Sequence, residues 1–370
     1  MGREQISQPG VRQLGRDHLN FNSMSILLRF SLALIFCLSA LPMRGGYVYV
    51  TNRSANTVSA YSIGTGGALV PVAGSPFATG SNPYAVAVDH TGKHVYVANQ
   101  LDNTLSAYSI GSGGVLTMIP GSPFVTGKGP VSVAADPKLP YIFVANYNDN
   151  TMSDFKIGSG GVLTAIPGTP FPTDQEPVFV AIDPGGEYLF LATQGSEMIY
   201  AFNIYPDGLL GSYNSVPLDG YLGGMIVLPP GRDVYISIND MAIVGAFRFS
   251  SSSQLELIKN EPFPAGDEPR LFATDSKGRF LYLTNGIGAD VSAYKIESDG
   301  SLRTLAGSPF FSGNAPYGLA VDSTDSYLYV ANFVDNTISG YSITKRGALK
   351  PVAGSPFATG DGPFSVATAP

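Results

Sequence analysis

One short strand-like segment recurs seven times along this chain of 370 residues. It reads Tyr-Val-Tyr-Val at 47–50, and successive copies begin 47 residues apart, except for one step of 45 residues. The other copies begin at His94, Tyr141, Tyr188, Asp233, Phe280 and Tyr327. A fixed period of this size, built from β-branched and aromatic residues, predicts a β-propeller with one blade per repeat.

The second repeat shows what each blade contains. Tyr84–Asp89 is the predicted inner strand, because its small alternating residues suit a crowded axis. His94–Asn99, Thr104–Ile110 and Val115–Ile119 follow as the next three strands, separated by turns rich in Gly, Asn and Asp. This order predicts four antiparallel strands per blade.

The two ends of the repeat array predict how the ring closes. The array starts with a second strand at Tyr47 and ends with an inner strand at Pro363–Ala367. The C-terminal strand is therefore expected to join the N-terminal blade, which covers two otherwise open strand edges. We predict an all-β, seven-bladed propeller as a single domain over residues 45–370.

The first 44 residues have the character of a targeting segment. Arg29 precedes the apolar run Phe30–Leu41, which is shorter than the ~20 residues of a membrane span. We interpret residues 24–44 as a signal peptide and residues 1–23 as a non-structural extension, since Met24 is a second possible start. The expected location is extracytoplasmic, either periplasmic or secreted, with no membrane span in the mature chain; an uncleaved anchor is the alternative.

The charge balance argues against a nucleic-acid partner. Of the 21 basic and 28 acidic residues, 16 and 26 lie after Arg44. Nucleic acids and anionic membranes both select a basic surface, which this composition does not provide.

Several repeated phrases carry a family resemblance. Tyr49-Val50-Thr51-Asn52 and its relatives resemble the YVTN-type repeats. The wider pattern, Pro-x-x-Val-Ala-x-Asp, then Tyr-Val-Ala-Asn, then Gly-x-Leu, is similar to the lactonase-like seven-bladed propellers, the family that includes 6-phosphogluconolactonase. The resemblance covers Tyr47–Pro370.

The resemblance also implies an axial site with a histidine, a carboxylate and arginines. Arg270, in Glu268-Pro269-Arg270, matches one such arginine. Val131 stands where the family pattern implies a histidine, and Val178-Phe179 stand where it implies an arginine followed by a histidine. A lactone hydrolase needs a base and a positive charge for the developing oxyanion, so this chain keeps only part of the set.

The loops before and after each inner-strand proline predict a cup at the axial mouth, with aromatic walls, an acidic rim and one arginine. Aromatic faces with rim carboxylates suit sugars or small polar ligands. The alternative is that the aromatics fill the channel and Arg270 pairs with Glu268 or Asp267. The candidate ligand-binding residues are Arg270, Glu268, Asp267, Tyr84, Tyr317, Phe364 and Glu176.

The remaining polar residues are interpreted as turn residues. His90 and His94 flank one turn, and an Asp recurs where inner strands end, which favours turn chemistry over a calcium site. Asn-Thr pairs recur in another turn, where local hydrogen bonds are expected. No metal or cofactor is predicted. The recurring Asp residues are Asp89, Asp136, Asp183, Asp275 and Asp322.

The preferred function is a non-catalytic binding or interaction module, whose partner is a small polar ligand, a carbohydrate or another envelope protein. One alternative is a lactone hydrolase of the 6-phosphogluconolactonase type that uses Arg270. A second is a structural propeller of the cell envelope. Repeats four and five, Tyr188–Pro264, depart most from the pattern, which marks either a partner-facing side or simple drift.

Overall fold

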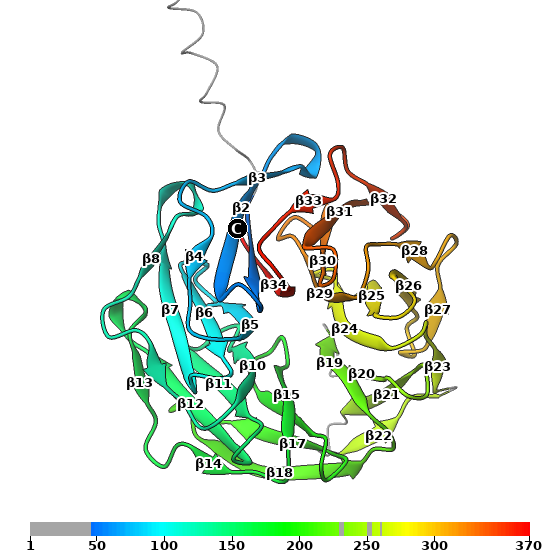
Figure 1. Ribbon diagram of the computed structural model, residues 1–370. Helices are drawn as coiled ribbons and strands as arrows, with labels where there is room; N and C mark the ends of the chain where they lie inside the picture. The colour runs from blue at the N-terminus through cyan, green and yellow to red at the C-terminus, as the bar shows by residue number, and fades with distance from the viewer. Residues whose placement is uncertain (1–45, 229–232, 250–253, 260) are drawn as a thin grey trace, which may run out of the picture. The chain divides into compact units, whose positions relative to one another are not determined.

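The strands form seven antiparallel sheets arranged in a ring (Figure 1). This computed structural model describes residues 46–228, 233–249, 254–259 and 261–370. The predicted all-β, seven-bladed propeller is confirmed. The predicted extension and signal peptide, 1–23 and 24–44, lie outside the described residues. Among the described residues, no helix has the length and apolar character that a membrane crossing needs.

The first two strands of every blade lie nearest the axis of the ring, with the inner strand followed by the second strand. The inner strands are β5 (Pro83–Val88), β10 (Pro130–Ala135), β15 (Pro177–Ile182), β19 (Leu222–Leu228), β24 (Pro269–Thr274), β29 (Pro316–Val321) and β34 (Pro363–Ala369). The second strands are β6 (His94–Asn99), β11 (Tyr141–Asn146), β16 (Tyr188–Thr193), β20 (Asp233–Ile238), β25 (Phe280–Asn285), β30 (Tyr327–Asn332) and β1 (Tyr47–Asn52).

The third and fourth strands complete each blade. The third strands are β7 (Thr104–Ile110), β12 (Thr151–Ile157), β17 (Met198–Ile204), β21 (Ile243–Phe249), β26 (Asp290–Ile296), β31 (Thr337–Ile343) and β2 (Thr57–Ile63). The outer strands are β8 (Leu116–Met118), β13 (Leu163–Ala165), β18 (Leu210–Pro217), β22 (Leu255–Leu257), β27 (Leu302–Thr304), β32 (Leu349–Pro351) and β3 (Leu69–Pro71).

Six blades carry one more element than the sequence predicts. A two-residue strand in the linker after the outer strand pairs with the third strand of the same blade. These strands are β9 (Phe124–Val125), β14 (Phe171–Pro172), β23 (Phe263–Pro264), β28 (Phe310–Phe311), β33 (Phe357–Ala358) and β4 (Phe77–Ala78). Three 3₁₀ turns, η1 (Thr65–Gly67), η2 (Ser112–Gly114) and η3 (Ser159–Gly161), precede outer strands.

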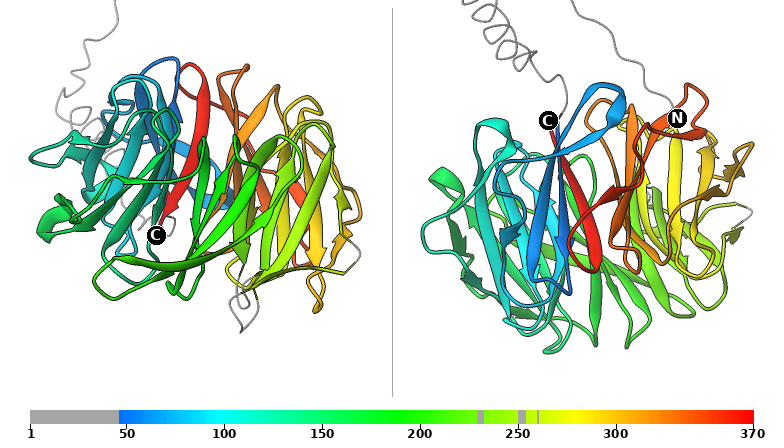
Figure 2. Two further views of the ribbon diagram at one scale, coloured as in Figure 1. Left: turned by 90° about the horizontal axis from the view of Figure 1, so that it is seen from below. Right: turned by 45° about the horizontal axis from the view of Figure 1, so that its top comes forward.

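The C-terminal strand closes the ring as predicted. β34 pairs antiparallel with β1, placing Tyr47 opposite Ala369 and Val50 opposite Val366. Figure 2 shows the red C-terminal strand beside the blue N-terminal strands. One strand from the C-terminus and three from the N-terminus therefore form one blade.

The core lies between neighbouring blades and explains the repeated Tyr-Val-Tyr-Val phrase. In five blades a fully buried tyrosine of the second strand donates its hydroxyl to a glycine carbonyl of the next blade, at 2.6–3.2 Å. A buried tyrosine needs such a partner for its hydroxyl. These tyrosines are Tyr49, Tyr96, Tyr235, Tyr282 and Tyr329.

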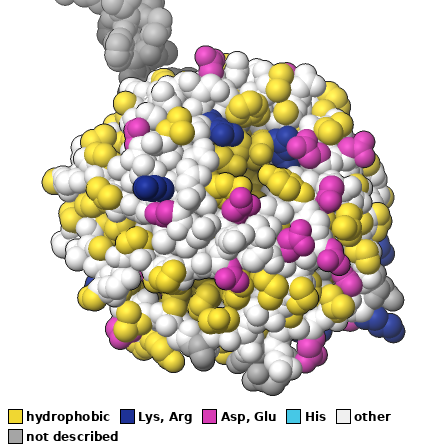
Figure 3. Space-filling model, turned by 60° about the horizontal axis from the view of Figure 1, so that its bottom comes forward, with side chains coloured by type: hydrophobic (Ala, Val, Ile, Leu, Met, Phe, Trp, Pro, Cys, Tyr) yellow, Lys and Arg dark blue, Asp and Glu magenta, His cyan; other side chains and the backbone are white. Residues whose placement is uncertain are grey.

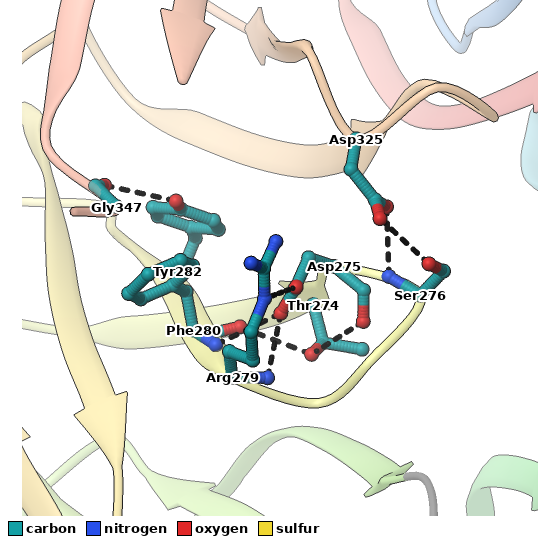
Figure 4. A network of polar contacts seen from close by, with 8 residues as sticks. All are labelled: Thr274, Asp275, Ser276, Arg279, Phe280, Tyr282, Asp325 and Gly347. Carbon is teal, nitrogen blue, oxygen red and sulfur yellow. Dashed lines mark hydrogen bonds and ion pairs between the residues drawn. The ribbon is translucent and has the colours of Figure 1, made fainter. Parts of the chain in front are cut away.

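The recurring aspartates are turn residues, as predicted. Figure 4 shows Asp275 accepting hydrogen bonds from the backbone amides of Arg279 and Phe280, at 2.7 and 2.9 Å, and pairing with the Arg279 side chain. All five aspartates are at most 4 % exposed. Their carboxylates thus fix the turn that leads from the inner strand to the second strand.

The predicted assignment of the two histidines to this turn also holds. His94 Nδ1 lies 2.9 Å from Asp89 Oδ2, inside the turn, and His90 is exposed. Although burial disfavours the charge, hydrogen bonds from His94 and Thr91 hold the pKa of Asp89 below its usual range. Within the described ranges, no group of three His, Cys, Asp or Glu side chains could hold a metal ion.

Candidate functional site

Two positions of the repeat supply the side chains at one end of the axis. The first is the residue after the opening residue of each inner strand: Tyr84, Val131, Val178, Gly223, Arg270, Tyr317 and Phe364. The second is the residue directly after each second strand: Arg53, Gln100, Tyr147, Gln194, Asn239, Gly286 and Phe333. We call this end of the ring the axial mouth.

Backbone hydrogen bonds hold both positions in place. The amide of Gln100 donates to the carbonyl of Asn82, just before the inner strand, at 3.1 Å, and the same bond recurs in the other blades. The ladder between inner and second strands also shifts register after the opening proline, between Pro83 and Ala85 in blade two. Such irregularities redirect side chains, here at the start of the inner strand.

The side chains of the recurring turn asparagines accept hydrogen bonds from backbone amides in the next blade's entry loop. Asn56 accepts from the amide of Asn82, and Asn103 accepts from that of Gly129, each 26 residues further along the chain and at 2.8 Å. The predicted turn position is correct, since both asparagines have positive φ, but the expectation of local bonds was wrong. Each bond ties one blade to the loop that enters the next inner strand.

Three aromatic rings stack along one wall of the axial mouth. The ring centroids of Tyr84 and Phe364 are 4.4 Å apart, and those of Phe364 and Tyr317 are 3.8 Å apart. Phe333 packs edge-on against Phe364 at 6.1 Å. The stack forms a continuous apolar wall from blades one, two and seven.

An arginine lies over each end of this stack. The Arg53 guanidinium is 4.8 Å from the Tyr84 ring centroid and 5.0 Å from that of Phe364. The Arg270 guanidinium is 3.8 Å from the Tyr317 ring centroid. Both geometries are cation–π contacts. They place two positive charges on one aromatic wall.

The two arginines differ in their polar partners. Arg53 Nε donates to Asn82 Oδ1 at 2.6 Å, whereas Arg270 Nη2 pairs with Glu268 Oε2 at 2.9 Å. Arg270 Nε is buried and has no hydrogen-bond partner in the structure. Gly286 makes room for this group, because a Cβ there would lie 2.7 Å from Arg270 Cζ. A buried donor without an acceptor is uncommon in proteins.

A cavity of about 270 Å³ lies against this wall. Its other sides are formed by apolar and amide side chains, including Gln194, whose Oε1 accepts from the Leu222 amide at 2.8 Å, and Asn239, whose buried Oδ1 has no partner. Figure 3 shows a face of the ring with a central hollow walled by hydrophobic side chains, basic groups at its margin and acidic groups around it. The remaining members include Gln100, Val131, Tyr147, Val178, Phe179 and Tyr221.

The tyrosines of the axial mouth stay protonated over the physiological pH range. Burial, with the nearby Tyr317, raises the pKa of Tyr84, and the positive charge of Arg53 only partly offsets this. Burial and the neighbouring Glu176 carboxylate raise the pKa of Tyr147. These hydroxyls can therefore donate hydrogen bonds to a ligand.

Comparison with models of protein families shows which family the chain belongs to. Residues 38–134 and 240–366, more than half of the chain, match the model described as "Lactonase, 7-bladed beta-propeller". The chain belongs to this lactonase family. The unmatched stretch, 135–239, contains all of blade four (β15–β18).

Solved structures support the lactonase fold and nothing finer. A candidate 6-phosphogluconolactonase of Bacteroides fragilis is 20% identical, with a TM-score of 0.75, over 88% of this chain and 98% of that one. A periplasmic gluconolactonase of Pseudomonas aeruginosa is 18% identical, with a TM-score of 0.72, over 88% and 99%. No protein of curated function matches the chain in sequence.

Most of the predicted site residues come together in this lactonase-family ring. Tyr84, Arg270, Tyr317 and Phe364 all border the cavity. Of the three predicted acidic residues, Glu268 pairs with Arg270, Glu176 lies beside Tyr147, and Asp267 is exposed. The aromatic rings stack as the channel-filling alternative expected, yet the cavity remains beside them.

The prediction of one arginine was wrong, because Arg53 also lies at the axial mouth. A signal for it exists in the sequence, since the residue after each second strand occupies a fixed place in the repeat. That position varies from blade to blade and also supplies Gln100, Tyr147, Gln194, Asn239 and Phe333. Val131 and Phe179 line the cavity where the resemblance implies histidines, and Val178 lines it where the resemblance implies an arginine.

Proposed function

We propose that the axial mouth binds a small anionic carbohydrate, namely a sugar acid or its lactone. The observation that carries the proposal is the pair of guanidiniums, Arg53 and Arg270, at the two ends of one aromatic wall. Arginine recognises carboxylates and phosphates through paired N–H donors. Arg270 lines the cavity, and Arg53 lies over Tyr84 and Phe364, which also line it, so the positive charge on this wall favours an anion.

The unpaired Nε of Arg270 supports the same ligand class. Its Nη2 is occupied by Glu268, but the buried Nε has no partner. A ligand carboxylate or phosphate oxygen would supply the missing acceptor. Glu268 then orients the guanidinium through Nη2 and leaves Nε for the ligand.

The rest of the cavity suits a polyhydroxylated body. Apolar sugar faces pack on aromatic rings, while amides and phenols bond hydroxyl groups. Tyr84 and Tyr317 supply rings, and Gln194 and Asn239 supply amides. The cavity volume of about 270 Å³ lies just below the range of about 300–1,000 Å³ that is usual for ligand sites, which favours a monosaccharide-sized ligand.

Binding without turnover is the preferred form of this proposal, because the histidines of the described chain, His90 and His94, do not line the cavity. Lactone hydrolysis is the second candidate, favoured by the family match and by the Glu176 carboxylate beside Tyr147. Glu176 would take a proton from water as water adds to the lactone carbonyl. An arginine would hold the oxyanion, and Glu176 would return the proton to the ring oxygen as the ring C–O bond breaks, which gives the hydroxy acid.

The proposal includes export, since the N-terminal segment resembles a signal peptide. Gluconate and gluconolactone are consistent with that location. A phosphorylated sugar lactone is a cytoplasmic metabolite and is less consistent with it.

Calorimetric titration of the full chain with gluconate tests binding. Arg270→Met and Arg53→Met should each weaken binding at least tenfold, because each removes a charge-assisted contact. Arg303→Met is the matched control, since its side chain is 60% exposed on β27, away from the cavity. No gluconate binding, or equal affinity in all three variants, contradicts the proposal.

A second assay separates binding from hydrolysis. The full chain is incubated with gluconolactone and 6-phosphogluconolactone while acid release is followed at constant pH. A rate equal to the spontaneous one supports a binding module. A faster rate that Glu176→Gln and Arg270→Met abolish, but Arg303→Met leaves intact, supports the hydrolase instead.

A further inference from the structure

Blade four departs from the other six blades at its outer edge. Its outer strand β18 is continuous over eight residues and pairs with β17 from Met198↔Pro217 to Ile204↔Leu210. The other blades have a three-residue outer strand followed by a linker and a two-residue strand. This edge therefore offers the neighbouring blade three a different surface.

A cavity of about 560 Å³ lies between these two blades, and none of its described lining residues lines the cavity at the axial mouth. In blades one, two, six and seven a third-strand tyrosine crosses the interface to the preceding blade, as when the Tyr61 hydroxyl donates to the Ala358 carbonyl at 2.7 Å and Tyr294 to Pro264 at 2.8 Å. Phe202 occupies this place in blade four, as Phe155 and Phe247 do in blades three and five, and has no hydroxyl to make the bond. We call the cavity the blade-four pocket.

A buried aspartate borders the blade-four pocket. Asp154 on β12 is 4 % exposed, and its Oδ1 has no hydrogen-bond partner. Every other blade has a small apolar residue or glycine at this repeat position: Ala60, Ala107, Ala201, Ala246, Ala293 and Gly340. The repeat therefore does not require a carboxyl group here.

The polar surroundings of Asp154 do not explain it. Its backbone amide donates to Thr169 Oγ1 at 2.7 Å, and the equivalent bond exists in blades whose residue is alanine, such as Ala107 to Ser122. Burial raises the pKa of Asp154 to about 8. The side chain is thus a neutral carboxylic acid at pH 7, facing an apolar space.

The other walls are aromatic and acidic. The rings of Tyr200 and Tyr213 stand edge-to-face at 5.4 Å, and Phe171 and Phe202 lie beside them. The Tyr200 hydroxyl bonds Asp174 Oδ2 at the rim. The described residues that line the pocket include no Lys, Arg or His, and its titratable members are Asp154, Asp174, Tyr200 and Tyr213.

We propose that the blade-four pocket binds a small organic amine in its protonated form, with the ammonium group on Asp154 and the apolar body between the aromatic rings. An ammonium donates to carboxylate oxygens and is attracted to aromatic faces. An anion would meet two carboxyl groups and no cation. The ligand class is therefore opposite in charge to that proposed for the axial mouth.

Binding at pH 7 releases a proton. Asp154 gives up its proton to the buffer, and the resulting carboxylate pairs with the incoming ammonium. Proton release should therefore approach one per bound amine at pH 7 and vanish near pH 9. Since the ionised fraction of a group with a pKa of about 8 rises roughly tenfold over that range, affinity should rise about tenfold.

Three matched probes test the charge preference: phenethylamine, phenylethanol and phenylacetate. The full chain is titrated with each and followed by NMR of the aromatic side chains. Phenethylamine should bind most tightly and shift the Tyr200 and Tyr213 signals. Equal binding of all three probes, or tighter binding of phenylacetate, overturns the proposal.

Two variants test the role of Asp154. Asp154→Ala introduces the residue that five other blades have, and it should weaken phenethylamine binding at least tenfold. Asp154→Asn keeps the shape and should abolish proton release, measured by calorimetry in two buffers of different ionisation enthalpy. Unchanged affinity in either variant overturns the proposal. Arg270→Met, in the axial mouth, should leave phenethylamine binding unchanged.

Discussion

The two ends of the inner strands follow opposite rules. At the turn end, a buried aspartate recurs in five blades and accepts backbone amides, as Asp275 does after β24. At the axial mouth, the residue after the opening position changes from blade to blade, and in β24 it is Arg270. The same residue type recurs at a position whose side chain must bond the backbone, whereas the residue type can vary at a position whose side chain does not. Of the two ends of the inner strands, the mouth is therefore the one where side chains for a ligand can gather.

Removing the closing strand should have the largest effect. Deletion of Pro363–Pro370 removes β34, whose pairing covers one edge of β1 and buries Phe364 at 2 % exposure. The ring would open, because the blade that contains β1 would lose its inner strand. We expect no cooperative thermal transition by circular dichroism, together with aggregation. A melting temperature equal to that of the full chain would contradict closure by this strand.

Substitutions at the two ends of β24 test the comparison directly. Asp275→Ala leaves the amides of Arg279 and Phe280 without their acceptor, which should cost about 2–4 kcal/mol of unfolding free energy. Asp267→Ala, at the mouth end and exposed, should change it by less than about 0.5 kcal/mol. Urea denaturation measures both. If both variants lose the same unfolding free energy, the turn end does not support the fold more than the mouth end does.

The repeat made the fold and the turn end predictable. Strand bounds such as His94–Asn99 and Thr104–Ile110 agree with the structure, because alternation and turn residues act locally. The two-residue strands, such as Phe124–Val125, were missed because so short a pairing depends on the neighbouring strand and leaves no alternation in the sequence.

The axial mouth was predictable in part, for a physical reason. Tyr84, Arg270, Tyr317 and Phe364 were found because the inner-strand proline marks their position. Arg53 was missed because its contact with Tyr84 joins two blades, and only the folded ring brings those positions together. The blade-four pocket was not predicted for the same reason, although the divergence of repeat four was noticed.

The contrast between repeated and varied positions extends to the third strands, where Asp154 replaces alanine. Its pKa of about 8 lies above the ordinary value of 3.8, so the folded chain keeps a proton that the unfolded chain loses between these pH values. The stability of the protein should therefore fall as pH rises from about 4 to about 8. Asp154→Ala should stabilise the ring by about 1–3 kcal/mol at pH 8 and by much less at pH 4. Urea denaturation at both values checks this, and a destabilised variant at pH 8 would show that Asp154 supports the fold.

The smallest expected effect concerns the space around Arg270. Gly286→Ala would place a Cβ 2.7 Å from Arg270 Cζ and from Glu268 Oε2, so the guanidinium must move. Gluconate affinity should fall about threefold to tenfold, while the melting temperature changes little, because Arg270 can rotate toward solvent at the open mouth. Gly288→Ala is the matched control in the same turn, where a Cβ would meet its nearest neighbours at 3.3 Å. If both alanines weaken gluconate binding equally, the orientation of Arg270 does not determine affinity. If only Gly286→Ala lowers gluconate affinity, and the melting temperature is unchanged, a varied position of the repeat determines ligand affinity without contributing to the stability of the fold.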